Sequence, residues 1–166
     1  RTKKVGVISG SEAIALGIVG PNLRGSGVKA DVRKDEPYAA YDQVEFTVPT
    51  ANDGDSYARS LVRFHEMKQS VSIIKQALDK IPDGPATVKV PAKAPEGEAF
   101  SRVESGRGEI GFYLVSTGSE RFHRLKIRAP SFRSLIAMPT VLKGVPMADV
   151  PTVYMGLDLL PFDIDR

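Results

Sequence analysis

Apolar residues recur at helical spacing over one long stretch of the chain, and this pattern limits the fold more than any other feature. They follow one another at intervals of three or four residues at Tyr57, Leu61, Phe64, Met67, Val71, Ile74, Leu78 and Ile81. Such spacing places them on one face of a continuous α-helix. The segment 52–55 offers capping oxygens before it, and Pro82 follows its end. Roughly 27 residues at ~1.5 Å each make a rod of about 40 Å. We therefore expect a helix at about 55–81 that belongs to a larger bundle and exposes its apolar face when isolated, with a risk of self-association.

The region after this helix carries strand-like patterns. Three stretches, Glu98–Glu104, Glu109–Ser116 and Arg121–Arg128, are separated by short glycine-containing turns, which is typical of an antiparallel meander. In the middle stretch, apolar residues occupy both faces, so we expect burial on both sides. Earlier in the chain, Gln43–Val48 alternates polar and apolar residues and ends at a proline, which predicts one more strand.

Shorter elements are expected around these two units. Ser11–Gly17 predicts a short helix with Ser9 or Ser11 as its cap, and Ser131–Leu142 predicts a helix interrupted near Pro139. The stretch 17–27 is rich in glycine and proline and predicts a loop. Asp149–Met155 fits a final short helix or strand.

The resulting fold class is α+β, with a long amphipathic helix, shorter helices and a small antiparallel β-meander. We divide the chain into a helical part at 1–85, an antiparallel β subdomain at 86–130, and a C-terminal helical segment and tail at 131–166. The chain opens Arg-Thr-Lys-Lys without a methionine or an apolar signal core, so we expect a single fragment of a larger subunit.

Composition excludes several classes of protein. With 166 residues, 42% hydrophobic and 26% charged, the chain is that of a core-forming domain rather than a disordered tail. Its apolar runs are too short to span a bilayer, so any action at a membrane is peripheral. There is no cysteine, which rules out disulfides, iron–sulfur ligation and a cysteine nucleophile within these residues.

Positive charge is concentrated in one stretch. Between Arg121 and Lys143 there are six Lys or Arg residues and no acid. Phosphate contacts to nucleic acid are one interpretation; docking on an acidic partner, or simple solvation, is another. Because no aromatic stacking platform or binding motif accompanies the charge, we do not expect nucleic acid as a partner.

No self-contained catalytic constellation emerges from the remaining residues. His65 and His123 lack acidic partners at metal-ligand spacing, and both are interpreted as surface residues. The glycine-rich stretch 106–111 precedes no helix, so it is a turn rather than a dinucleotide loop. The tail carries three carboxylates that fit solvated surface groups as well as they fit acid–base or cation-binding groups: Asp158, Asp163 and Asp165.

The tail also carries a resemblance. Gly156–Arg166 resembles the C-terminus of the nickel–iron hydrogenase large-subunit superfamily, in which an Asp-Pro-Cys-x-x-Cys segment supplies metal thiolates. The two thiolate positions fall on Leu160 and Asp163, and Leu159 stands in place of the usual proline. Without soft sulfur ligands at these positions, we expect no metal on this chain.

The resemblance extends over nearly the whole chain. The blocks Gly20–Val28, Asp31–Phe46, Arg102–Ser116 and Arg128–Phe132 together resemble the C-terminal half of the D-type (49-kilodalton) subunit family of NADH:quinone oxidoreductase, complex I. This implies the quinone-site, electron-transfer subunit of a respiratory enzyme, a metal-free relative of the hydrogenase large subunit. The family's N-terminal half, with the residues that contact the quinone headgroup, is absent, so this chain alone is expected to be inactive.

The resemblance also implies roles for particular residues. Asp158 and Leu160 would line the quinone cavity, Asp158 as a charge and Leu160 as an apolar wall. A second group would hold the structure or interface near that site, or tune the nearby cluster: Arg24, Arg33, Lys34, Asp163, Asp165 and Arg166.

Partners and location follow from the same resemblance. Quinone is the implied substrate, and electrons arrive from iron–sulfur clusters in partner subunits, with NADH or, as the short linker 85–98 suggests, a deazaflavin cofactor as the donor. The chain would sit peripherally at the cytoplasmic face of the cell membrane. The alternative is a non-catalytic assembly or scaffold module of a hydrogenase-related membrane complex, with its basic sheet as docking surface.

Overall fold

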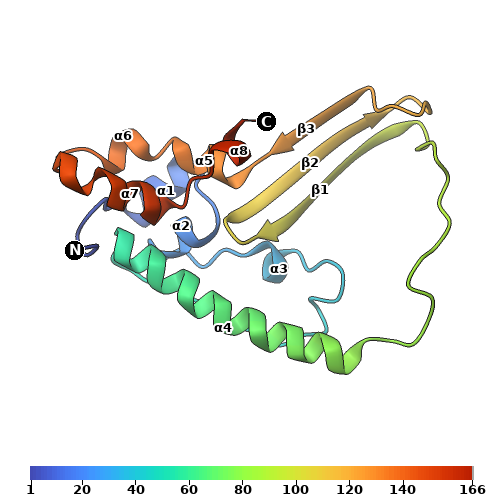
Figure 1. The fold of residues 1–166 in the computed structure, drawn as a ribbon, viewed down its shortest axis with the longest axis horizontal. Helices are drawn as coiled ribbons and strands as arrows, with labels where there is room; N and C mark the ends of the chain where they lie inside the picture. Colours follow the sequence, from blue (N-terminus) through green and yellow to red (C-terminus); the bar gives the residue numbers. More distant parts are fainter. Residues whose placement is uncertain (166) are drawn as a thin grey trace.

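The computed structural model describes residues 1–165 and confirms the α+β class. Figure 1 shows most of the short helices gathered at one end, a three-stranded sheet projecting from them, and one long helix running beneath both. The helices are α1 (Gly10–Ala15), α2 (Gly20–Arg24), α3 (Val32–Asp35), α4 (Ser56–Lys80), α5 (Pro130–Leu135), α6 (Met138–Val141), the 3-10 turn η1 (Met147–Asp149), α7 (Val150–Leu157) and α8 (Pro161–Ile164). The strands are β1 (Gly97–Ser105), β2 (Gly108–Ser116) and β3 (Arg124–Arg128).

The hydrophobic core lies among the short helices and joins the two ends of the sequence. Ile8, Ala13 and Ile18 from the N-terminal segment pack with Val153 and Leu157 of α7. Leu23, Ala137, Val141 and Leu159 complete this cluster. Burial of these side chains on folding is the main stabilising force at this end of the molecule. No helix within residues 1–165 is both long and apolar enough to cross a membrane.

The sheet is the predicted antiparallel meander, in the order β1-β2-β3. Gly97 pairs with Ser116 at one end of the first hairpin, and Ser105 pairs with Gly108 at its turn. Helices contact the turn end, while the other end projects away from them (Figure 1). The expected burial of the middle strand on both sides is therefore wrong: its apolar side chains are half-buried, and Phe112 is exposed.

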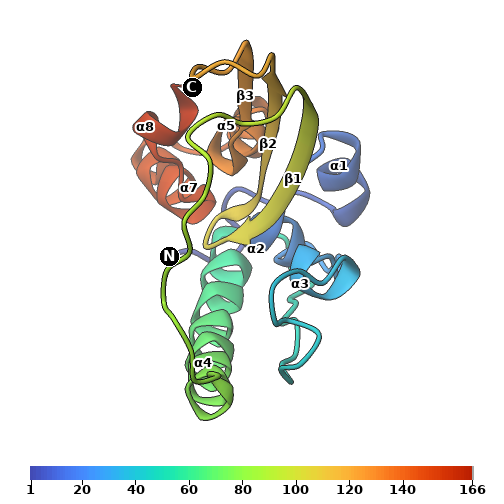
Figure 2. The ribbon, with the colours of Figure 1, turned by 90° about the vertical axis from the view of Figure 1, so that its right-hand side faces the viewer.

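The predicted long helix is confirmed as α4. Its N-cap is Asp55, whose carboxylate accepts a 2.7 Å hydrogen bond from the Ala58 amide. The predicted apolar stripe faces away from the chain, because Phe64, Val71 and Leu78 are each more than half exposed. Figure 2 shows the C-terminal half of α4 projecting beyond the other helices, flanked only by loop segments.

The segment Gln43–Val48 is not a strand, and the prediction of one is wrong. In place of a neighbouring strand, two glutamine side chains of α4 form hydrogen bonds with the backbone of this segment. The Gln76 side chain accepts from the Glu45 amide at 2.8 Å and donates to the Glu45 carbonyl at 2.7 Å. Gln69 accepts from the Thr47 amide at 3.0 Å. Side-chain amides here satisfy backbone groups as a paired strand would.

The shorter elements agree in part with the sequence pattern. The first helix is confirmed with Ser9 as its cap, in a capping box with Glu12. The prediction of a loop over the whole stretch 17–27 is wrong, because the stretch contains α2. Pro21 lies in the first turn of that helix, where a proline lacks no needed hydrogen bond and favours helical geometry. The ambiguous segment near the C-terminus is helical, as η1 and α7.

Candidate functional site

A backbone contact places the β1–β2 turn on α2. Gly20 and Gly108 both have left-handed φ values, of 67° and 128°. A Cβ on Gly20 would lie 2.3 Å from the Gly108 Cα, so only glycine permits this approach. The contact carries Arg107, the residue before Gly108, over the C-terminal tail.

Asp158 lies where this turn meets the tail. It follows the last residue of α7 with φ 54° and ψ 51°, a left-handed conformation that aspartate tolerates better than most residues. The Arg107 Nε lies 3.2 Å from the Asp158 carboxylate and donates to the Asp158 carbonyl at 3.2 Å. Both side chains are about one-third exposed, at 35% and 34%. The pair is thus accessible to a ligand from outside the chain.

A second arginine, Arg63, contacts Asp158 from α4. We call the site formed by Asp158, Arg107 and Arg63 the Asp158 corner. Arg63 of α4 places its Nε 3.9 Å from the Asp158 carboxylate and donates to the Gly156 carbonyl at 2.8 Å. It also donates to the Asn22 side chain at 2.8 Å. Asn22 in turn donates to the Leu157 carbonyl at 2.9 Å, so α2, α4 and α7 are tied together behind Asp158. Burial lowers the pKa of Arg63, while the charge of Asp158 opposes that effect.

The two leucines after Asp158 have different environments. Leu159 is 3% exposed and belongs to the hydrophobic core. Leu160 is half-buried and is the N-cap residue before α8, with an extended backbone. The tail therefore anchors through Leu159 and leaves part of Leu160 available at the surface.

Arg24 and Arg33 lie in a buried cluster beside the sheet. The Arg24 Nε lies 2.6 Å from Glu66, and its terminal nitrogen lies 2.9 Å from Glu104 and 3.7 Å from Asp31. Arg33 binds the Asp31 carboxylate through two nitrogens, at 2.9 and 2.6 Å. Burial raises the pKa of Asp31, but the bonds and charge of Arg33 lower it overall. Both arginines are thus committed to carboxylates of their own chain.

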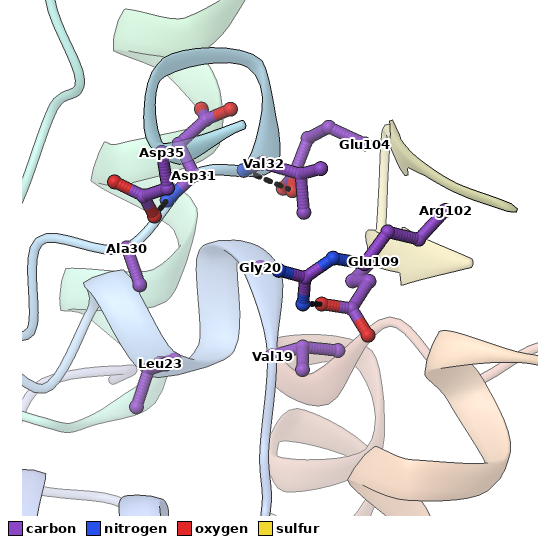
Figure 3. Close-up of a pocket in the computed structure, with 10 residues that line it drawn as sticks. All are labelled: Val19, Gly20, Leu23, Ala30, Asp31, Val32, Asp35, Arg102, Glu104 and Glu109. Carbon is purple, nitrogen blue, oxygen red and sulfur yellow. Dashed lines mark hydrogen bonds and ion pairs between the residues drawn. The ribbon is translucent and has the colours of Figure 1, made fainter. Parts of the chain in front are cut away.

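Glu104 lies between two cavities at this cluster. A small cavity of about 60 Å³ is lined by Gly20, Val32 and Glu104 among others, as Figure 3 shows. A larger cavity of about 320 Å³ is lined by Arg63, Glu66 and Glu104. Burial raises the pKa of Glu104 above the usual glutamate range, although Arg24 opposes the shift.

The remaining predicted residues lie elsewhere. The Asp163 carboxylate accepts from the Ser131 amide at 3.2 Å, in the first turn of α5, where an acceptor is favourable. Lys34 is exposed and lies 4.2 Å from the centre of the Phe46 ring. Asp165 is exposed, and Arg166 lies outside the described residues. Within residues 1–165, no group of three His, Cys, Asp or Glu side chains is placed to hold a metal ion.

The predicted residues therefore do not converge on one point. Asp158 and Leu160 stay at the tail corner, Arg24 and Arg33 share a cluster beneath the sheet, and the others are spread over the surface. Sequence reasoning did not select Arg63 and Arg107, which contact Asp158, or Asn22, which bonds to Arg63. It also did not select Glu104 of the neighbouring Arg24 cluster. Spacing alone gives no signal that these residues, remote from one another in the sequence, lie close together in the fold.

A comparison with protein families matches the whole chain. The family described as "Respiratory-chain NADH dehydrogenase, 49 Kd subunit" matches residues 1–94 and 86–166. Among curated relatives, a D-type subunit of the NADH-quinone oxidoreductase of Herpetosiphon aurantiacus is 45% identical over all of this chain and 46% of its own length. The D-type subunit of the same enzyme in Bacillus mycoides is 46% identical over 99% of this chain and 46% of its own length.

A solved structure agrees with these matches. A chain of the membrane-bound sulfane sulfur reductase, an archaeal respiratory membrane complex, superposes with a TM-score of 0.93. It is 42% identical, and the match covers all of this chain and 47% of that one. The chain thus spans a little less than half the length of the relatives that it matches.

Proposed function

The chain belongs to the family of the 49-kDa subunit of respiratory-chain NADH dehydrogenase, and from this membership we propose that it is part of the quinone-site, electron-transfer subunit of a membrane-bound respiratory complex. Quinone takes up two electrons and two protons and becomes quinol. The electrons come from iron–sulfur clusters in partner subunits, supplied by NADH or a deazaflavin donor elsewhere in the complex. The chain sits peripherally at the cytoplasmic face of the membrane and is inactive without its partners.

The Asp158 corner carries this proposal. A partly exposed carboxylate lies 3.2 Å from the guanidinium of Arg107, and Arg63 holds the backbone behind it. A guanidinium of this kind stabilises negative charge that develops on a quinone oxygen during reduction. We propose that Asp158, which lies beside this guanidinium, exchanges a proton with the reduced oxygen. Leu160, half-buried two residues on, supplies part of an apolar wall for the ring.

The other predicted residues support the site from a distance. Arg24 joins α2 to α4 through Glu66, and Arg33 binds the nearby Asp31, so both are committed to carboxylates of their own chain rather than to a partner. Lys34 is exposed and is available to a partner subunit. Asp163 accepts from the first turn of α5, and Asp165 is exposed and available to a partner subunit.

A sulfur substrate is a second candidate. It is favoured by one observation, the TM-score of 0.93 to a chain of a complex named for sulfane sulfur reduction. Purified complex containing this chain should be assayed with a short-chain quinone and with a dialkyl trisulfide as alternative electron acceptors. Turnover with the quinone supports the proposal, and turnover with the trisulfide alone replaces it with the sulfur reaction.

The scaffold alternative is separated by variants in the same assay. Leu160→Phe should change the KM for quinone or inhibitor sensitivity, because it alters the proposed wall. Lys126→Gln on the exposed face of β3 serves as the comparison. Loss of assembly in Lys126→Gln, with unchanged quinone kinetics in Leu160→Phe, would favour the scaffold.

A further inference from the structure

Five charged side chains form a row from the Asp158 corner to the interior. In order they are Asp158, Arg63, Glu66, Arg24 and Glu104, and their charges alternate in sign. Arg63 and Glu66 are three residues apart on α4, on neighbouring positions of the helix, and both line the 320 Å³ cavity. Glu104 lines the same cavity from β1. We call these five side chains the charge row.

The interior end of the charge row is poorly neutralised. The Glu104 side chain is 4% exposed. Its Oε1 lies 2.9 Å from a terminal nitrogen of Arg24 without a well-aligned hydrogen bond, and its Oε2 accepts only a long one, of 3.4 Å, from the Val32 amide. Arg24 is shared with Glu66 and Asp31, and the nearby Arg33 is bound to Asp31, so no cation is committed to Glu104 alone. A buried carboxylate in this position is costly when ionised.

We propose that Glu104 is a proton-binding site at the end of the charge row, and that it releases its proton when Asp158 loses its negative charge. The proton leaves Glu104 for water through the 320 Å³ cavity and returns by the same route. This site is not among the residues that line the proposed quinone cavity. The link to quinone chemistry, but not proton binding itself, rests on the proposed function of Asp158.

The groups around Glu104 set the direction of this response. Charged side chains surround Glu104 from five elements, α2, α3, α4, β1 and β2, and from the residue before α3. Near the Arg24 contact and the larger cavity they are Arg24, Asp31, Arg33, Arg63 and Glu66, and across the small cavity they are Asp35, Arg102 and Glu109. Arg33 is bound to Asp31, and Asp31 repels an ionised Glu104. Arg24 is the cation in direct contact, so any change in how strongly its charge is shared alters the cost of ionising Glu104.

Neutralising Asp158 makes the row more positive. Arg63 then loses a carboxylate partner, and its charge acts more strongly on Glu66 and Arg24. Arg24 in turn becomes a better partner for ionised Glu104, which favours release of the proton. Arg107 lies beside Asp158 at the outer end of the row. Removing its positive charge makes the surroundings of Glu104 more negative and favours retention of the proton. The two changes therefore shift proton binding at Glu104 in opposite directions.

A carbon-detected NMR titration of the carboxyl groups in the 166-residue chain tests the site directly. In the parent chain, Glu104 should titrate above the ordinary range of glutamate side chains. In Asp158→Asn its titration should move to lower pH, and in Arg107→Gln to higher pH, with circular dichroism used to check that each variant is folded. A general loosening of the structure would instead move both toward the ordinary glutamate range. Titration of Glu104 in the ordinary range in the parent, or movement of both variants in one direction, overturns the proposal.

The link to turnover is measured in the assembled complex. Glu104→Gln should displace the pH profile of quinone reduction, whereas Glu120→Gln, an exposed glutamate on the β2–β3 loop, should leave it in place. An unchanged profile in Glu104→Gln overturns the link. If the parent complex reduces no quinone, the proposed function fails while the titration still decides the proton site.

Discussion

The two faces of α4 differ in an unexpected way. Beyond the buried Ala58 and Val62 near its start, the face toward the rest of the chain carries polar and charged side chains, among them Arg63, Glu66 and Gln76, each with a specific partner. The opposite face carries Phe64, Val71 and Leu78 of the stripe, each more than half exposed. An ordinary surface helix has the reverse arrangement.

This difference shows that two separate kinds of interaction hold one helix. Hydrogen bonds and ion pairs fix its position and register against this chain, because they are directional. The exposed part of the apolar stripe leaves area that is open to a further partner. Each of the following changes acts on one face and leaves the other in place.

The largest effect is expected at Arg24, which joins α2 to the charged face. Arg24→Met leaves Asp31, Glu66 and Glu104 without their shared cation, so unfolding free energy should fall by about 3–5 kcal/mol. Urea denaturation measures the loss. Lys34→Met removes an exposed cation and should cost less than about 1 kcal/mol. Equal losses in the two variants would show that the buried cluster is not special.

The second-largest effect is expected at the β1–β2 turn, where Gly108 contacts Gly20 of α2. Gly108→Ala forces a side chain against Gly20, at a left-handed φ of 128°, and should cost about 2–4 kcal/mol. Gly106→Ala, in the same turn, has no atom within 4 Å of the added carbon and should be nearly neutral. Thermal unfolding of the pair measures the contrast, and a tolerated Gly108→Ala would refute the close backbone approach.

A smaller effect is expected where α4 holds the segment 43–48. Gln76→Ala removes both bonds to the Glu45 backbone and should cost about 1 kcal/mol. Hydrogen exchange at the Glu45 amide should become faster, because that amide loses its acceptor. Lys75→Ala, at the neighbouring exposed position, provides the control. Unchanged exchange in Gln76→Ala would mean that another element protects the segment.

The smallest change in stability is expected on the open face. Val71→Lys should alter unfolding free energy by no more than about 0.5 kcal/mol, because Val71 is 53% exposed. It should nevertheless reduce self-association of the chain, measured by light scattering, since it places charge within the apolar stripe. Asp79→Lys, an exposed residue of α4 outside the stripe, should not. A monomeric parent chain would contradict the expected self-association.

Local patterns predicted much of this fold. The spacing of the stripe located α4, the acidic residues before it supplied Asp55 as cap, and the alternating stretches located the sheet. The pattern did not reveal which face of α4 meets its own chain, since an apolar stripe indicates a partner without indicating whose. The alternation in 43–48 was misleading, because Gln69 and Gln76 replace the missing strand.

The site was harder to predict than the fold. Asp158 was selected through the family resemblance of the tail. The two arginines that contact it, Arg63 and Arg107, lie 95 and 51 positions before it in the sequence. Buried charges depend on partners from remote segments, and no local periodicity marks them. Glu104 was the hardest residue to predict. Charged residues are rarely buried, and nothing in the sequence of its strand indicated that its side chain is only 4% exposed.

The measurement that tests the central claim most directly is quinone reduction by the assembled complex carrying Asp158→Asn. Asparagine keeps the shape of the side chain and removes its charge and its proton exchange, so we predict a fall in kcat of about tenfold or more. Asp83→Asn, an exposed carboxylate beyond the end of α4, should retain the parent rate. Turnover in Asp158→Asn equal to that of Asp83→Asn, in fully assembled complex, would contradict a role for this corner in quinone reduction.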